Sequence, residues 1–164
     1  MDAREIRSLL PHRYPFLMVD NITDMNQGES CIGEKKVTLN EPCYANVTDS
    51  GDGTELHYPI SLQLESFAQV GALLVLSSRK ALNVNESFVM LAGSVRGMKI
   101  LSAVEPGNTL VHKVKIVKEL TDTVVIGGEI FARRNNHSND QIVGEVGSMV
   151  IAVRPREGLM PEHS

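Results

Sequence analysis

The sequence predicts an α+β domain in which one long central helix is wrapped by an antiparallel sheet of five or six strands. Residues 61–81 are the only long helical segment, and their apolar positions cover nearly every side of the helix. A helix that is apolar all round is buried all round. Strand-like segments fill most of the remaining chain and do not alternate with helices, which disfavours a doubly wound parallel sheet.

The elements are separated by short polar breaks. A short amphipathic start at Glu5–Leu10 ends before Pro11, because the residue before a proline avoids helical angles. Residues 1–154 are expected to form a single domain, and the polar residues 155–164, with two prolines, a flexible tail. The expected strands are Phe16–Val19 continuing to Ile22, Glu29–Leu39, Phe88–Ile100, Thr109–Leu120, Thr123–Arg134 and Gln141–Arg154.

Two interruptions carry structural information. Gly127–Gly128 lies inside a strand and predicts a bulge or bend, which a sheet curling around a helix requires. Residues 40–59 are polar and rich in turn residues, and loops of about this length in compact domains are usually functional or mobile. The long helix follows directly, with Pro59 suited to its first turn or Ser61 to its cap.

Composition excludes several classes of protein. With 164 residues, 42% hydrophobic and 22% charged, the chain can build a core and is not intrinsically disordered. A net charge of −4 without a Lys/Arg cluster argues against a nucleic-acid binder. Cys31 and Cys43 cannot form a disulfide framework, and the longest apolar run, Val70–Leu76, is too short to span a bilayer. A reduced, cytoplasmic protein is expected.

Glu65 and Gln69 are the first candidate site residues. They are four positions apart, so they share one face of a helix that is otherwise apolar. A carboxylate in such a setting needs a partner, a proton or a cavity, which suits a general acid or base. The alternative is a glutamate near the start of the helix that interacts with the helix dipole.

The five histidines have no metal-ligand spacing, and no metal site is expected. His57 is the one of interest, because it lies eight residues before Glu65 at the start of the helix. It could equally be an ordinary loop histidine.

Several segments of the sequence resemble one family. The opening stretch Ile6-x-x-Leu-Leu-Pro-His-Arg-Tyr-Pro-Phe-Leu-Met-Val-Asp20 is similar to the opening signature of the bacterial 3-hydroxyacyl-[acyl-carrier-protein] dehydratases of fatty acid synthesis. The segments Asn40-Glu-Pro42, Leu64-Glu-Ser-Phe-Ala-Gln69, Leu91-Ala-Gly93 and Val104-x-Pro-Gly-Asn-x-Leu110 resemble further landmarks of that family. The match covers residues 5 to 154.

The resemblance implies a hotdog fold and a dimer whose sheets join edge to edge, with acyl tunnels at the interface. It also implies substrates carried on the phosphopantetheine of an acyl carrier protein, and no metal or redox cofactor. In the family, a histidine of one protomer removes the C2 proton, and a glutamate of the other helps the C3 hydroxyl to leave as water.

Carried over by position, Glu65 matches the catalytic acid and Gln69 its helix companion, which we expect to contact substrate. The backbone N–H groups at Ile60 and Ser61 match the thioester contact. The histidine does not carry over: Val47 falls at its position, and the loop is about four residues longer than the family pattern. Valine cannot accept a proton.

Three hypotheses follow. The chain is a non-catalytic or half-catalytic subunit that pairs with a histidine-bearing homologue, in fatty acid or polyketide-type biosynthesis. Alternatively, it is an active dehydratase in which the longer loop brings His57 or another group to the place of the missing base. A third possibility is a thioesterase or an acyl-binding module that keeps the acyl tunnel.

Overall fold

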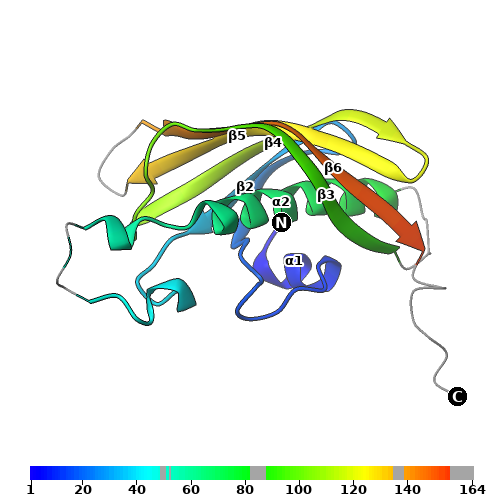
Figure 1. Cartoon of the computed structure of the whole chain (residues 1–164). Helices are drawn as coiled ribbons and strands as arrows, with labels where there is room; N and C mark the ends of the chain where they lie inside the picture. Colours follow the sequence, from blue (N-terminus) through cyan, green and yellow to red (C-terminus); the bar gives the residue numbers. More distant parts are fainter. Residues whose placement is uncertain (49–50, 52, 82–87, 135–138, 156–164) are drawn as a thin grey trace, which may run out of the picture.

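A six-stranded antiparallel sheet curls around one long helix (Figure 1). The computed structural model describes residues 1–48, 51, 53–81, 88–134 and 139–155. Its elements are α1 (Ala3–Leu9), β1 (Asn21–Asn26), β2 (Ser30–Lys36), the 3₁₀ helices η1 (Pro42–Tyr44) and η2 (Thr54–Leu56), α2 (Ile60–Ala81), β3 (Phe88–Ile100), β4 (Asn108–Leu120), β5 (Thr123–Arg134) and β6 (Gln141–Pro155).

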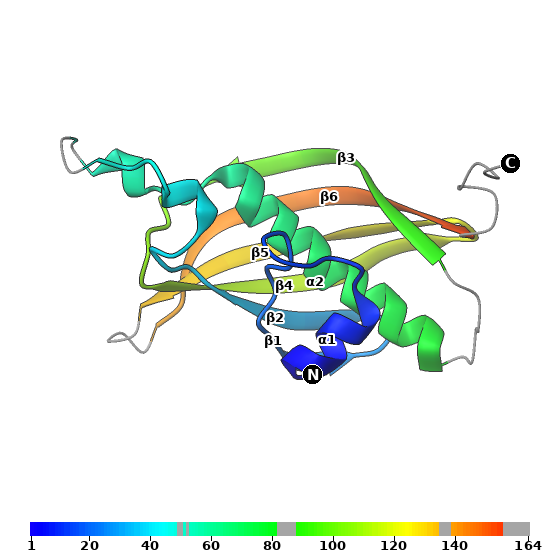
Figure 2. The ribbon, with the colours of Figure 1, turned by 90° about the horizontal axis from the view of Figure 1, so that it is seen from below.

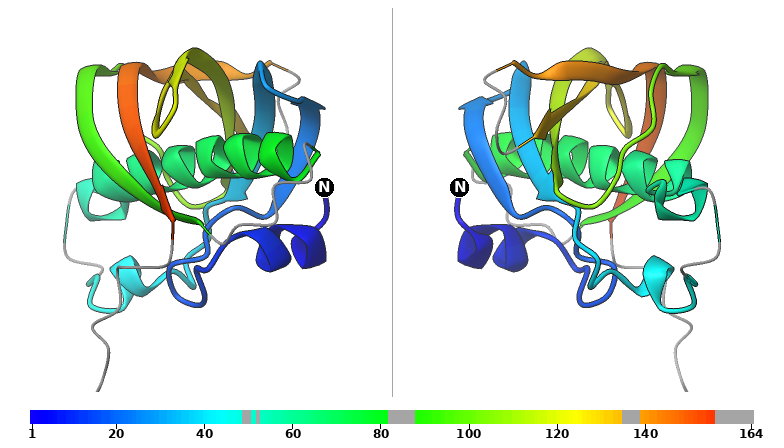
Figure 3. Two further views of the ribbon diagram at one scale, coloured as in Figure 1. Left: turned by 90° about the vertical axis from the view of Figure 1, so that its right-hand side faces the viewer. Right: turned by 90° about the vertical axis from the view of Figure 1, so that its left-hand side faces the viewer.

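The strand order is β1-β2-β4-β5-β6-β3, and every neighbouring pair is antiparallel. The end-on views show the sheet bending round α2, with α1 on the opposite side of that helix (Figure 3). The predicted fold class, a long helix wrapped by an antiparallel sheet, is therefore confirmed. The order also makes β3, with thirteen residues, an edge strand of the sheet.

Two glycines let α2 lie close against the sheet. A Cβ atom added at Gly71 of α2 would clash with the Ile126 side chain of β5, and one added at Gly33 of β2 would clash with Val70. By length and composition, the stretch Thr54–Ser78 is apolar enough to cross a membrane, but 61% of its most apolar window is buried inside the molecule. This is the burial of a core helix.

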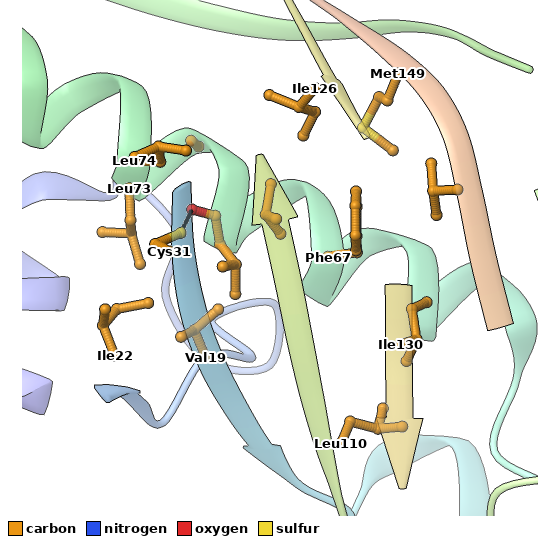
Figure 4. Close-up of a cluster of buried hydrophobic side chains, with 14 of the residues drawn as sticks. Val19, Ile22, Cys31, Phe67, Leu73, Leu74, Leu110, Ile126, Ile130 and Met149 are labelled. Atoms are coloured by element: carbon orange, nitrogen blue, oxygen red, sulfur yellow. Dashed lines mark hydrogen bonds between the residues drawn. The ribbon is translucent and has the colours of Figure 1, made fainter. Parts of the chain in front are cut away.

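The core forms where α2 meets the concave face of the sheet (Figure 4). Burying each large apolar side chain there contributes about 1.5–3 kcal/mol. The thiol of Cys31 donates to the carbonyl of Val70 across this interface (3.5 Å). The labelled side chains, all at most 4% exposed, are Val19, Ile22, Cys31, Phe67, Leu73, Leu74, Leu110, Ile126, Ile130 and Met149.

The first strand begins later than the sequence predicts. Residues 16–19 form a turn and an irregular stretch, and β1 starts only at Asn21. The physical reason is a side chain: Gln69 of α2 binds the carbonyl of Phe16 and the N–H of Met18, which are therefore not available for a sheet. The opening segment instead passes along α2, where Figure 2 shows it in blue.

The predicted bulge is present. The register between β5 and β6 shifts between Ile126 and Gly128, and a Cβ at Gly128 would clash with the carbonyl of Lys113 on β4. The predicted tail falls almost entirely outside the described residues, since β6 ends at Pro155.

Candidate functional site

Helix α2 presents Glu65 and Gln69 on the face turned towards the opening segment. The helix starts after Pro59, whose carbonyl accepts the N–H groups of Leu62 and Gln63 (3.0 and 3.1 Å). Glu65 follows in the second turn, and its side chain is 35% exposed. Gln69 lies one turn later and is 1% exposed.

Gln69 links Glu65 to the N-terminal segment. Its amide nitrogen donates to Glu65 Oε1 (2.8 Å) and to the carbonyl of Phe16 (2.5 Å), and its oxygen accepts the N–H of Met18 (2.9 Å). Both N–H hydrogens of the side chain therefore have acceptors within the chain. The expected contact of Gln69 with substrate stays a prediction.

A histidine lies beside Glu65, and it is His12. His12 Nε2 is 3.6 Å from Glu65 Oε1, and the two side chains are 34% and 35% exposed. Sequence reasoning missed this pair, because no periodicity relates positions 53 residues apart. The available signal was the opening signature, residues 6–20, which contains both His12 and the backbone groups that Gln69 binds.

The loop after β2 offers no base at the expected position. Val47 packs against the hydrophobic core, and its N–H donates to the carbonyl of Tyr44 (3.2 Å). Residues 40–56 contain no histidine at all. The loop is anchored at its start, where Glu41 forms a largely buried ion pair with Lys35 of β2.

His57, the predicted substitute base, faces a different carboxylate. Its Nε2 is 3.8 Å from Glu105 Oε1, and both side chains are more than 40% exposed. Glu105 also pairs with Arg134 of β5 (3.3 Å). The structure thus places His57 with Glu105 and His12 with Glu65; a catalytic role for His57 stays a prediction.

Ile60 and Ser61 occupy the first positions of α2, and both are exposed. The first four N–H groups of a helix have no intrahelical acceptor, so these two can bind an external oxygen. Their predicted contact with a thioester is compatible with this geometry and stays a prediction.

A second histidine contacts α2 from the sheet side. His112 of β4 is fully buried, and its Nε2 lies 2.9 Å from Ser66 Oγ. Burial lowers the pKa of His112 to about 3, so the ring is neutral at physiological pH. Ser66 is itself 0% exposed, so neither member of this pair reaches the surface of the chain. Among the described residues, no group of three or more His, Cys, Asp or Glu could hold a metal ion.

The comparison with known proteins identifies the family. The FabA-like domain matches residues 10–145. The chain belongs to the FabA-like family. Its relatives are FabZ-type 3-hydroxyacyl-[acyl-carrier-protein] dehydratases: that of Shewanella sediminis is 35% identical over 142 residues (79% of this chain, 86% of the relative). That of Rickettsia canadensis is 35% identical over 144 residues (80% and 92%).

Solved structures agree on the fold of this FabA-like chain. The ApeI:P dehydratase heterocomplex of Xenorhabdus doucetiae superposes with a TM-score of 0.69 at 14% identity (92% of this chain, 91% of that one). The PaaI protein of Escherichia coli, from the phenylacetic acid degradation operon, gives 0.57 at 13% identity (80% and 81%). At such identities the likeness shows the hotdog fold alone, which confirms the expected architecture.

Proposed function

We propose that the chain is the glutamate-bearing subunit of a dehydratase that acts on 3-hydroxyacyl thioesters carried by an acyl carrier protein in the cytoplasm. Family membership supports the reaction class. The observation that carries the proposal is the environment of Glu65: it is held at Oε1 by Gln69, it is partly exposed, and no described contact involves Oε2. Oε2 is therefore available to a substrate hydroxyl.

The chemistry divides between two side chains. A base removes the proton at C2, and the electron pair of that C–H bond forms the C2–C3 double bond. The C3–O bond breaks at the same time, and the carboxyl of Glu65 gives its proton to the departing hydroxyl, which leaves as water. Each such proton transfer contributes on the order of 10²–10⁴ in rate.

The base comes from a second chain in this proposal. Val47 stands where the family has its histidine, and it is packed against the core of its own chain. A histidine-bearing homologue would place its histidine opposite Glu65, so that one of the two sites in the pair would work. The dehydratase neighbour from Xenorhabdus doucetiae is described as a heterocomplex, so a dehydratase of this fold can contain more than one kind of chain.

Strand β3 offers the surface for pairing. It ends the sheet, and an edge strand has backbone N–H and C=O groups available to another chain. Leu91 and Ile100 on β3 are 51% and 41% exposed. Near the start of α2 and in the opening segment, Ile60, Phe16 and Tyr14 are 49%, 57% and 85% exposed. These apolar side chains fit a protein partner or an acyl chain.

Complementation tests the proposal. The chain is mixed with a histidine-bearing 3-hydroxyacyl-[acyl-carrier-protein] dehydratase of the same organism whose own catalytic glutamate is replaced by glutamine. Neither protein alone is expected to dehydrate 3-hydroxyacyl-carrier protein, whereas the mixture should, because Glu65 and the partner histidine then share a site. A mixture that forms a heterodimer by native mass spectrometry and still does not dehydrate would refute the proposal, and thioester hydrolysis in its place would indicate a thioesterase.

A further inference from the structure

His12 is held in place by the turn that precedes the first strand. The side chain of Arg13 donates from Nη1 to the carbonyls of Leu10 and His12 (2.8 and 2.6 Å). A few residues after this turn, the backbone of Phe16 and Met18 is hydrogen-bonded to the side chain of Gln69 on α2. The segment that follows the turn is therefore attached to the helix that carries Glu65.

The ring of His12 contacts the carboxylate of Glu65 through one of its two nitrogen atoms. Nδ1 is buried and has no hydrogen-bond partner there, while Nε2 points to Glu65 Oε1 at 3.6 Å. The same oxygen accepts the N–H of Gln69. Two nitrogen atoms thus converge on Oε1 from two segments of the chain, and neither of these contacts involves Oε2.

We propose that His12 is a positioning residue for Glu65. This inference rests on the proposed function, in which Glu65 is the proton donor to the leaving hydroxyl. When Glu65 has given up its proton, the N–H groups of His12 and Gln69 stabilise the resulting carboxylate at Oε1, and Oε2 keeps its direction towards the substrate. Gln69 already makes this hydrogen bond, while His12 Nε2, at 3.6 Å, is just beyond hydrogen-bond distance and is expected to close on Oε1 once that oxygen is charged. A hydrogen bond to a carboxylate is about twice as strong as one to a neutral acceptor.

The pair of His57 and Glu105 provides a matched control within the same molecule. It has the same chemistry at nearly the same separation, 3.8 Å, but it lies at the start of α2 with Arg134 as a third member. A change that is specific to the Glu65 site should leave this second pair unaffected.

Nuclear magnetic resonance of the histidine rings tests the contact in the chain alone. Long-range ¹H–¹⁵N spectra of the ¹⁵N-histidine-labelled protein are recorded for the wild type, Glu65→Gln and Glu105→Gln, with His12 assigned from His12→Gln. Glu65→Gln should shift the ring nitrogens of His12 and leave those of His57, and Glu105→Gln should do the reverse. Unchanged His12 signals in Glu65→Gln would overturn the inference.

Turnover in the complementing mixture tests the role. His12→Phe removes the N–H donor and should lower kcat by about tenfold to a hundredfold, the cost of a misplaced catalytic group, with little change in KM. His12→Gln keeps an N–H donor and should recover part of the loss, while Glu105→Gln, in the control pair, should have no effect. Wild-type kcat in His12→Phe would overturn the inference. If the wild-type mixture does not dehydrate, the proposed function fails, and the spectra still decide whether His12 holds Glu65.

Discussion

The amide of Gln69 donates to Glu65 Oε1 across one turn of α2, at 2.8 Å. The same amide binds the backbone of the opening segment on both sides of residue 17. One buried side chain therefore joins the candidate proton donor to the segment that carries His12. Substitution of Gln69 is therefore expected to lower both the stability and the turnover.

Gln69→Leu is expected to lower the free energy of unfolding by about 2–3 kcal/mol, because it leaves the buried N–H of Met18 without an acceptor. Urea unfolding measures this. The control is Ser78→Ala on the same helix, which removes a hydrogen bond from the N–H of Gly28 at an exposed turn. If the free energy of unfolding falls by the same small amount in both variants, Gln69 does not have this structural role.

Glu65→Gln is expected to lower the turnover of the complementing mixture by on the order of 10²–10⁴, since the amide of glutamine is not acidic enough to protonate the leaving hydroxyl. Its unfolding free energy should stay within about 0.5 kcal/mol of the wild type, because the amide oxygen of glutamine can still accept the N–H of Gln69. Glu105→Gln, at a carboxylate of similar exposure that also faces a histidine, should keep full turnover. Steady-state kinetics and urea unfolding on the same samples decide this, and equal activity in the two variants would exclude Glu65 as the acid.

His112 predicts a pH dependence of stability. Its pKa is lowered from 6.5 to about 3 in the folded state by burial. Between these values the unfolded chain binds a proton that the folded chain does not, so stability is full above about pH 6.5 and falls as the pH drops towards 3. For this group alone the loss between pH 7 and pH 5 is about 2 kcal/mol.

The measurement is the unfolding free energy of the wild type and of His112→Leu at pH 7 and pH 5. The variant loses the hydrogen bond to Ser66 and starts from a lower stability, so only the change with pH is compared. That change should be smaller in His112→Leu, while His57→Leu, at a side chain 44% exposed, should keep the wild-type slope. The same slope in all three proteins would contradict a neutral, buried His112.

The ion pair of Lys35 and Glu41 should make the effects of substitutions at these two positions on the free energy of unfolding strongly coupled. Both side chains are largely buried, at 8% and 14% exposed. Lys35→Met should cost about 3–5 kcal/mol, because it leaves the carboxylate of Glu41 buried without its cation. Adding Glu41→Gln to Lys35→Met should restore part of the stability, and a double-mutant cycle by urea unfolding measures this coupling. Additive losses would show that the two charges do not depend on each other.

The architecture was predictable from the sequence because it depends on patterns that are local along the chain. The all-round apolar helix at 61–81 and the long strands after it correspond to α2 and to β3–β6. The start of the first strand was not predictable from local pattern, because residues 16–19 are as apolar as a strand. Their backbone is held in another conformation by the side chain of Gln69, which is 51 residues away from Met18 along the chain.

The site was predictable in part for the same reason. Glu65 and Gln69 share a helix face, so their spacing alone predicts that they meet. His57 was predicted as a substitute base because it is near Glu65 along the chain, yet its side chain faces Glu105. The contact of His12 with Glu65 depends on how the opening turn lies along α2, and that information is tertiary.

The central claim is that the chain has the acid of a dehydratase and lacks the base. The most direct test is loss of water from a 3-hydroxyacyl-carrier protein incubated with the purified chain alone, read by mass spectrometry, beside the Glu65→Gln variant. We predict that the wild-type chain alone forms no more product than the variant. Dehydration by the chain alone that disappears in Glu65→Gln would contradict the account, since a base would then be present within the chain itself.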